Sequence, residues 1–170
     1  MRPPCRRERK TMANKSEKTN VMRILGAAGV PYTAHAYDTS QLDACHAADD
    51  LGVARERLFK TLVTVAPGGG HYVFLLPAGA TLDLKRAARA AGVKSVAMLP
   101  QKDLLPLTGY VHGGCSPIGM KKPFPTFVDE SAAGFSTILF SGGHIGFMVE
   151  VAPGALLSLV GATYAPLTAD

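Results

Sequence analysis

Hydrophobic side chains recur at helical spacing in several short segments of the chain. Residues 21–28 place them at positions i, i+3, i+4 and i+7, behind a threonine and an asparagine that can cap a helix. Helices are also predicted at 44–51 and 84–91, each behind a capping aspartate and before a glycine, and at 153–160, which begins with proline. A single helical turn is expected at 100–105.

Strand-forming residues occupy most of the intervening segments. Residues 59–65 and 71–76 predict a hairpin, because a Pro-Gly-Gly-Gly turn joins them. The other expected strands are 32–37, 93–97, 126–129, 137–140 and 147–151. Helices and strands do not alternate regularly, and the stretch 108–124, rich in glycine and proline, has no regular pattern. The fold class is therefore α+β: a single domain with a mixed, largely antiparallel twisted sheet flanked by helices.

Charge divides the chain into a tail and a body. The net charge of the whole chain is +5, yet residues 1–18 alone hold seven basic and two acidic side chains. The remainder is balanced, with eleven of each sign. Residues 1–17 are predicted to be a disordered basic extension, and 18–170 the folded domain. A neutral body does not attract polyanions by bulk charge, so a nucleic-acid ligand would need a local patch or the tail as a binding arm.

Cysteine and histidine usage indicates neither a disulfide framework nor a metal site. The three cysteines, Cys5, Cys45 and Cys115, are widely separated, and the five histidines show no ligand spacing. No signal peptide is recognised, and no apolar run reaches the roughly 18 residues of a membrane span. These features predict a cytoplasmic protein without metal, cofactor or membrane association.

Lys60 is the first candidate for chemistry, because it stands in an otherwise apolar strand. Alternation places Lys60, Leu62 and Thr64 on one face of that strand. A cation that shares a face with leucine predicts a partly enclosed cavity. The alternative is a lysine at a strand end whose ammonium reaches water.

Two glycine-rich turns are further candidates. In residues 113–119, consecutive backbone N–H groups could bind an anion or a carbonyl oxygen, although a plain turn explains the glycines equally well. Cys115 in this loop could act as a nucleophile if a base such as His112 or His144 contacts it, but a buried thiol is the commoner outcome. Ser141, which opens the second turn at 141–144, could present its hydroxyl to a site.

Taken together, these segments resemble the YbaK/EbsC family, the stand-alone relatives of the editing domain of bacterial prolyl-tRNA synthetases. The resemblance runs from about residue 20 to 167 and lies in an ordered set of short motifs: residues 51–53, 59–63, 82–85, 91–94, 108–119, 141–143 and Gly146. It implies an enzyme that deacylates mischarged tRNA in trans, with cysteinyl-tRNA(Pro) or cysteinyl-tRNA as the first candidate substrate. Mischarged tRNA and prolyl-tRNA synthetase are the implied partners.

The same resemblance assigns roles to individual residues. It implies that Lys60 and the loop residues Gly113, Gly114 and Ser116 are catalytic, the loop acting through backbone N–H groups without a protein nucleophile. The implied substrate-binding residues are Tyr37, Cys115, Pro117, Ser141, Gly142 and Met148.

The chain departs from the YbaK pattern at two positions near the site. Asp43 stands where YbaK has an aromatic residue, and Met148 where it has an aspartate. A pocket so changed could suit another small amino acid, such as alanine on tRNA(Pro). A thiol hydrolase built on Cys115 and a non-catalytic aminoacyl- or nucleotide-binding regulator are the competing hypotheses.

Overall fold

The computed structural model describes residues 18–40 and 43–169, so the predicted 1–17 extension lies outside the described residues. The helices are α2 (Asn20–Ala27), α3 (Ala44–Leu51), α4 (Leu84–Ala91), α5 (Gln101–Thr108) and α6 (Pro153–Val160), with a 3-10 turn η1 (Glu130–Gly134). Side-chain caps begin α2, α3 and α4. Thr19 Oγ1 accepts the Met22 N–H at 3.2 Å, and the carboxylates of Asp43 and Asp83 do the same for α3 and α4.

The strands form two sheets instead of one. Antiparallel strands β1 (Thr33–Ala36), β7 (Phe147–Val151) and β6 (Ile138–Ser141) make the smaller sheet, in that order. The larger sheet has the order β4 (Ala97–Met98), β2 (Phe59–Val65), β3 (His71–Pro77), β5 (Thr126–Asp129) and β8 (Thr163–Ala165). Its β4-β2-β3 part is antiparallel, and β5 and β8 are added in parallel. The predicted α+β class with mixed pairing is confirmed.

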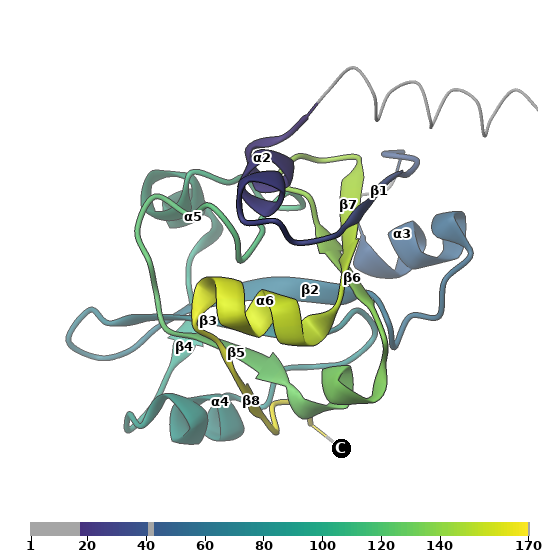
Figure 1. Cartoon of the computed structure of the whole chain (residues 1–170). Helices are drawn as coiled ribbons and strands as arrows, with labels where there is room; N and C mark the ends of the chain where they lie inside the picture. The colour runs from purple at the N-terminus through teal and green to yellow at the C-terminus, as the bar shows by residue number, and fades with distance from the viewer. Residues whose placement is uncertain (1–17, 41–42, 170) are drawn as a thin grey trace, which may run out of the picture.

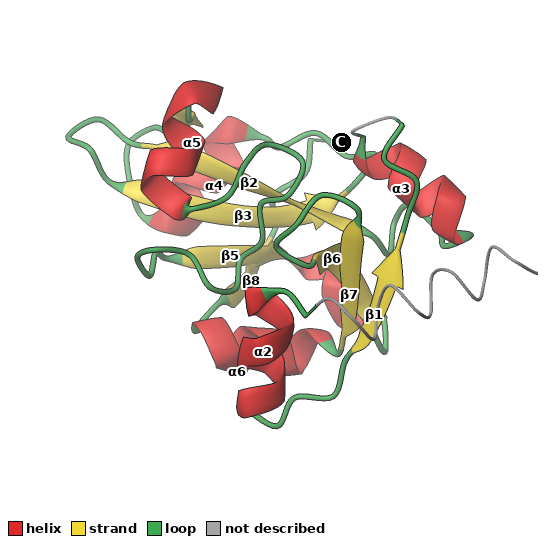
Figure 2. Cartoon of the chain, turned by 90° about the horizontal axis from the view of Figure 1, so that it is seen from above, coloured by secondary structure: helices red, strands yellow, loops and turns green. Residues whose placement is uncertain are grey.

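Helices cover both faces of the larger sheet. Figure 1 shows α6 on one side of it and α4 on the other, and in Figure 2 α2 lies beside α6. Alternate residues of β3 divide between the two layers. Val73 and Leu75 join the main core, which includes residues of α2 and α6, while Phe74 and Leu76 pack with the buried alanines of α4. This period-2 division is the reason that β3 is apolar almost throughout.

The two sheets meet where β2 begins. Leu58 forms a parallel bridge with Leu139, and the Leu139 N–H donates to Arg57 O at 3.0 Å. The Arg57 guanidinium in turn binds Glu150 on β7. Burial opposes ionisation of Glu150, but hydrogen bonds from Thr137 and His35 and the charge of Arg57 outweigh it, so the pKa of this carboxyl is lowered. This charged network holds the start of β2 against the smaller sheet, just before Lys60.

Several element predictions are corrected by the structure. Only Ala97 of the expected 93–97 strand is in β4, because Gly92 ends α4 in the left-handed conformation and the Val93 N–H folds back to Ala88 O. The expected turn at 100–105 is a longer helix, α5, which continues through Pro106 to a stop at Gly109. Strand β8 and η1 are additions that the local sequence pattern did not predict.

Candidate active site

A cavity of about 330 Å³ lies at the start of β2, beside the junction of the two sheets. Its wall is made by α3, β2, α5, the loop after α5 and the ends of β6 and β7. The lining residues are Tyr37, Asp43, Ala44, Ala47, Phe59, Lys60, Thr61, Leu62, Ala78, Leu104, His112, Gly113, Cys115, Ser141 and Met148. Most of these side chains are apolar, and a few polar groups converge among them, as is usual for small-molecule sites.

Lys60 contributes a cation to this wall. Its side chain is half-buried, and Nζ donates a hydrogen bond to the backbone oxygen of Ala80 at 2.5 Å. An ammonium group has three donor hydrogens, so this bond orients the group and leaves two hydrogens for a ligand. The bond to Ala80 O holds the ammonium group at the cavity wall, and the nearby residues Phe59 and Leu62 of the same strand also line the cavity. The lysine therefore does not extend from a strand end into bulk water.

The glycine loop contributes Gly113 and Cys115 to the wall of the same cavity as Lys60. Gly113 has φ +88°, which a residue with a side chain rarely adopts. The Gly114 N–H donates to Val111 O at 3.0 Å and so is already used. Among the hydrogen bonds of the described residues, the N–H groups of Gly113, Cys115 and Ser116 have no acceptor. Of these three residues Gly113 and Cys115 line the cavity, so their N–H groups are the donors that the loop can offer to a ligand, whereas Ser116 is fully buried.

The second glycine turn packs directly on this loop. A Cβ placed on Gly114 would lie 3.2 Å from the Ile145 backbone nitrogen, so a side chain here would push the two turns apart by a few tenths of an ångström. Within the turn, the Gly142 N–H donates to Phe147 O at 2.9 Å and the Gly143 N–H to Ser141 Oγ at 3.2 Å. Ser141 is thus fixed by its own turn while it lines the cavity.

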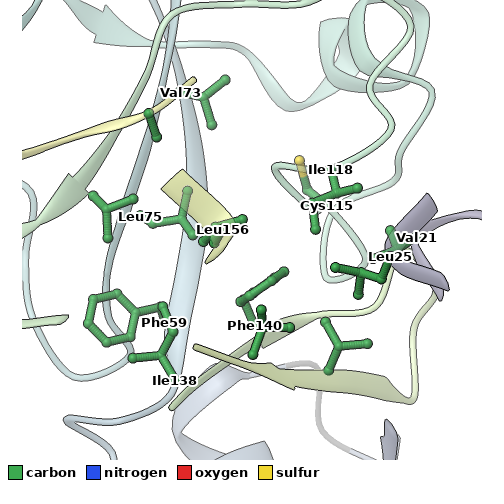
Figure 3. Close-up of a cluster of buried hydrophobic side chains, with 14 of the residues drawn as sticks. Val21, Leu25, Phe59, Val73, Leu75, Cys115, Ile118, Ile138, Phe140 and Leu156 are labelled. Carbon is green, nitrogen blue, oxygen red and sulfur yellow. The ribbon is translucent and has the colours of Figure 1, made fainter. Parts of the chain in front are cut away.

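Cys115 lines the cavity but is a poor nucleophile. Figure 3 shows its sulfur beside Ile118 and near Val21 and Leu25 in the main core. Burial raises the pKa of this thiol to about 12, more than a hydrogen bond with Thr108 lowers it. Because the thiolate is the reactive form, Cys115 is protonated and inert at neutral pH. The burial of this thiol argues against the thiol-hydrolase hypothesis.

We expect Cys115→Ala to keep the activity of the unchanged protein within about threefold, because a protonated thiol takes no part in the reaction. Loss of the buried sulfur should lower the free energy of unfolding by about 1 kcal/mol, as a small cavity does. Chemical denaturation measures the second effect, with the half-buried Cys45 changed to alanine as the control. A Cys115→Ala protein that is folded but inactive would restore the thiol to the mechanism.

The structure brings together one part of the predicted site and separates another. Lys60, Gly113, Tyr37, Cys115, Ser141 and Met148 line the same cavity. The predicted residues Gly114, Ser116, Pro117 and Gly142 do not line it. Ser116 is fully buried and its Oγ accepts the Ile118 N–H at 3.4 Å, so it supports the loop and is not exposed to the cavity.

Other lining residues are not identified as site residues by the sequence. The sequence marks Asp43 only as a helix cap and a departure from the YbaK pattern, and His112 only as a base for Cys115. Strand alternation assigns Thr61 to the face opposite Lys60. Its Oγ1 is buried, and no hydrogen-bond partner for it is found among the described residues. A solitary threonine in a strand carries no signal in the sequence, so only the tertiary structure could reveal it.

Neither a metal centre nor a membrane span is found in the described part of the chain. Within residues 18–40 and 43–169, no group of three or more His, Cys, Asp or Glu side chains is arranged to hold a metal ion. No helix in the same ranges is long and apolar enough to cross a bilayer.

Fold and cavity together define a single α+β domain whose pocket combines a strand lysine with free backbone donors. Residues 39–159 match the model of the aminoacyl-tRNA editing domain. The chain belongs to this family, which includes the YbaK proteins that the sequence resembles.

Relatives and solved structures agree with this assignment. The chain is 46% identical over 154 residues to EbsC of Enterococcus faecalis, a candidate Cys-tRNA(Pro)/Cys-tRNA(Cys) deacylase, covering 89% of this chain and 94% of EbsC. YwhH of Bacillus subtilis, which is uncharacterized, is 28% identical over 118 residues, or 69% of this chain and 74% of YwhH. The crystal structure of a candidate trans-editing enzyme for prolyl-tRNA synthetase superposes with a TM-score of 0.77 at 28% identity, over 91% of this chain and all of that one. The hypothetical protein APE2540 shares the fold, with a TM-score of 0.82 at 24% identity over 89% of this chain and all of that one.

Proposed function

We propose that this protein deacylates mischarged aminoacyl-tRNA in trans, as a stand-alone editing enzyme. One observation carries the proposal: Lys60 and the Gly113–Cys115 bend line a single cavity large enough for the aminoacyl end of a tRNA. Family membership supports the reaction class, and the absence of a reactive thiolate at Cys115 argues against the competing hydrolase.

The loop donors supply the electrostatic part of the mechanism. The ester carbonyl oxygen is placed against the N–H groups of Gly113 and Cys115, the two loop residues that line the cavity, and these donors stabilise the negative charge that develops on it. The loss of one such donor typically slows an enzyme by about 10²–10³-fold. Gly114 has a structural role in this scheme, because its own N–H is bound to Val111 O while its missing side chain lets the two turns pack.

Lys60 supplies the positioning part. Its ammonium is anchored by Ala80 O at 2.5 Å, so its remaining hydrogens have a defined direction. They bind the terminal ribose or phosphate and hold the ester against the loop. A fixed geometry of the reacting groups removes an entropic barrier, which is sufficient for an activated ester.

The side chain of the amino acid faces the apolar part of the wall, where Met148 replaces the YbaK aspartate and Ala47 and Ala78 are small. This lining suits a thiol or a methyl group, and the similarity to EbsC, a candidate deacylase of cysteinyl-tRNA, favours cysteine. With cysteinyl-tRNA, the substrate thiol loses its proton and attacks its own ester carbonyl carbon. A C–S bond forms, the C–O bond to the ribose breaks, and the ribose oxygen takes up the proton. The cysteine thiolactone that is released is then hydrolysed by water to cysteine. With alanyl-tRNA, the second candidate, water attacks instead.

A deacylation screen over Cys-, Ala-, Ser- and Pro-charged tRNA tests the proposal. We expect the fastest turnover on cysteinyl-tRNA and at least tenfold slower turnover on seryl-tRNA, because oxygen is the weaker nucleophile at neutral pH. Equal rates on these two substrates would exclude thiol assistance. No turnover on any of the four, together with retained ligand binding, would support the non-catalytic regulator instead.

The partners follow from the same proposal. Residues 19–170 carry no net charge, so this part of the protein has little general affinity for tRNA. Selection of tRNA(Pro) then comes from a complex with prolyl-tRNA synthetase, the synthetase that the structurally similar trans-editing candidate is thought to serve. The cytoplasm, where tRNA is charged, is the proposed location.

A further inference from the structure

Asp43 brings a carboxylate to the rim of the cavity. It is the N-cap of α3, and its Oδ1 accepts the Cys45 N–H at 3.2 Å. It is also a lining residue, and among those residues it is the acidic one. Lys60, on β2, is the cation of the same wall, so the cavity presents opposite charges from two different elements.

Capping does not explain why this residue carries a charge. Serine, threonine and asparagine cap helices about as well as aspartate. A carboxylate has two oxygens, each able to accept more than one hydrogen bond, and the cap uses one of them. Arg55 interacts electrostatically with Asp43, but its hydrogen bond goes to Asp49, where the guanidinium Nη2 donates to Oδ2 at 2.6 Å. A carboxylate oxygen of Asp43 thus remains for a ligand.

The proposed substrate has a matching group. An aminoacyl ester carries a free α-amino group on the carbon next to the reacting carbonyl, and such groups have an ordinary pKa of about 8, so they are largely ammonium at neutral pH. When the carbonyl oxygen lies at the Gly113 and Cys115 donors and the ribose at Lys60, the ammonium group needs an acceptor elsewhere in the wall. Asp43 is the carboxylate that the wall offers.

We infer that Asp43 binds the α-ammonium group of the aminoacyl ester and makes the enzyme selective for substrates whose amino group is free. The inference rests on the proposed deacylase function and adds a third anchor to it. Three anchors of different chemistry fix the orientation of a small, chiral ester, and they direct its side chain to Met148, Ala47 and Ala78.

The test compares cysteinyl-tRNA with N-acetyl-cysteinyl-tRNA, each rate being divided by the uncatalysed rate of the same ester. We expect the unchanged protein to prefer the free amine by roughly tenfold, the lower end of the range for a charged hydrogen bond, because Asp43 is exposed. Asp43→Asn keeps the cap and should lose this preference by slowing only on the free amine. Asp83→Asn is the matched control, since Asp83 caps α4 and does not line the cavity.

Two outcomes would overturn the inference: equal rates of the unchanged protein on both esters, or an Asp43→Asn protein that slows equally on both. A binding measurement keeps the test separate from turnover. It uses stable amide analogues of 3′-alanyl-adenosine with and without the amino group. An Asp43-dependent preference for the amine-bearing analogue, in a protein that hydrolyses no ester, would refute the deacylase and retain the ammonium site. Equal affinities for the two analogues would refute the ammonium site.

Discussion

Lys60→Ala should lower kcat/KM for deacylation of cysteinyl-tRNA by roughly 10- to 100-fold, the range expected when a charged hydrogen bond to the substrate is lost. The protein should remain folded, because the half-buried Lys60 side chain makes its hydrogen bond to a backbone oxygen, Ala80 O, at the cavity wall and not within the core. Steady-state kinetics at fixed ionic strength measures the first effect, and thermal unfolding measures the second.

The exposed Lys94, which does not line the cavity, provides the control. Lys94→Ala removes the same charge from the molecule and should leave the rate unchanged within about twofold. If both variants slow equally, the lysines act through general attraction of tRNA and not through a site. Wild-type turnover by a folded Lys60→Ala protein would remove Lys60 from the mechanism.

Gly143→Ala should have the largest effect on stability. Gly143 has φ +88°, and a Cβ at this position would lie 2.7 Å from Val21 Cγ2 and 3.2 Å from Tyr110 Cε1. A left-handed backbone with a side chain costs about 1–3 kcal/mol, and overpacking of a core costs a similar amount. The free energy of unfolding should therefore fall by about 2–5 kcal/mol, with a decrease in Tm of roughly 5–15 °C.

The same substitution should reduce activity in the fraction that remains folded. Val21 belongs to α2, and Tyr110 to the segment between α5 and the glycine loop, so the displaced turn moves Ser141 and the loop donors together. Gly134→Ala is the control, because a Cβ added at Gly134 would meet no atom within 4 Å and the φ of this residue is not positive. A Gly143→Ala protein with unchanged Tm would mean that the contact of the turn with α2 is looser than the structure indicates.

Local physics predicted the secondary structure wherever both ends of an element were marked. Helices α3 and α4 lie between a capping aspartate and a left-handed glycine, and their observed bounds agree with the sequence pattern. Strand β2 was correctly placed because of its unbroken run of strand-forming residues. The predictions failed where pairing is non-local: β8 is held by parallel pairing with β5, which no short window of sequence contains.

The candidate site shows the same division. Lys60, the glycine loop and Ser141 are indicated by the sequence and its resemblance, and six of the predicted residues line one cavity. Which N–H of the loop is free could not be predicted, because the answer depends on the bond from Gly114 to Val111 O. The sequence likewise could not place Asp43 in the cavity wall. Its role as a helix N-cap is a local feature, whereas the cavity that it shares with residues of β2 forms only in the tertiary structure.

By itself the sequence determined the fold class, the elements with marked ends, the charge of the tail and the residue types that can bind an ester, because each of these depends on neighbours along the chain. The tertiary structure decided that there are two sheets, that Lys60 and the loop line one cavity, that Cys115 is a buried thiol and that Asp43 lines the same cavity. The physical reason is that the cavity is built by segments from Tyr37 to Met148, whose approach depends on core packing and on the network that joins β2 to the smaller sheet.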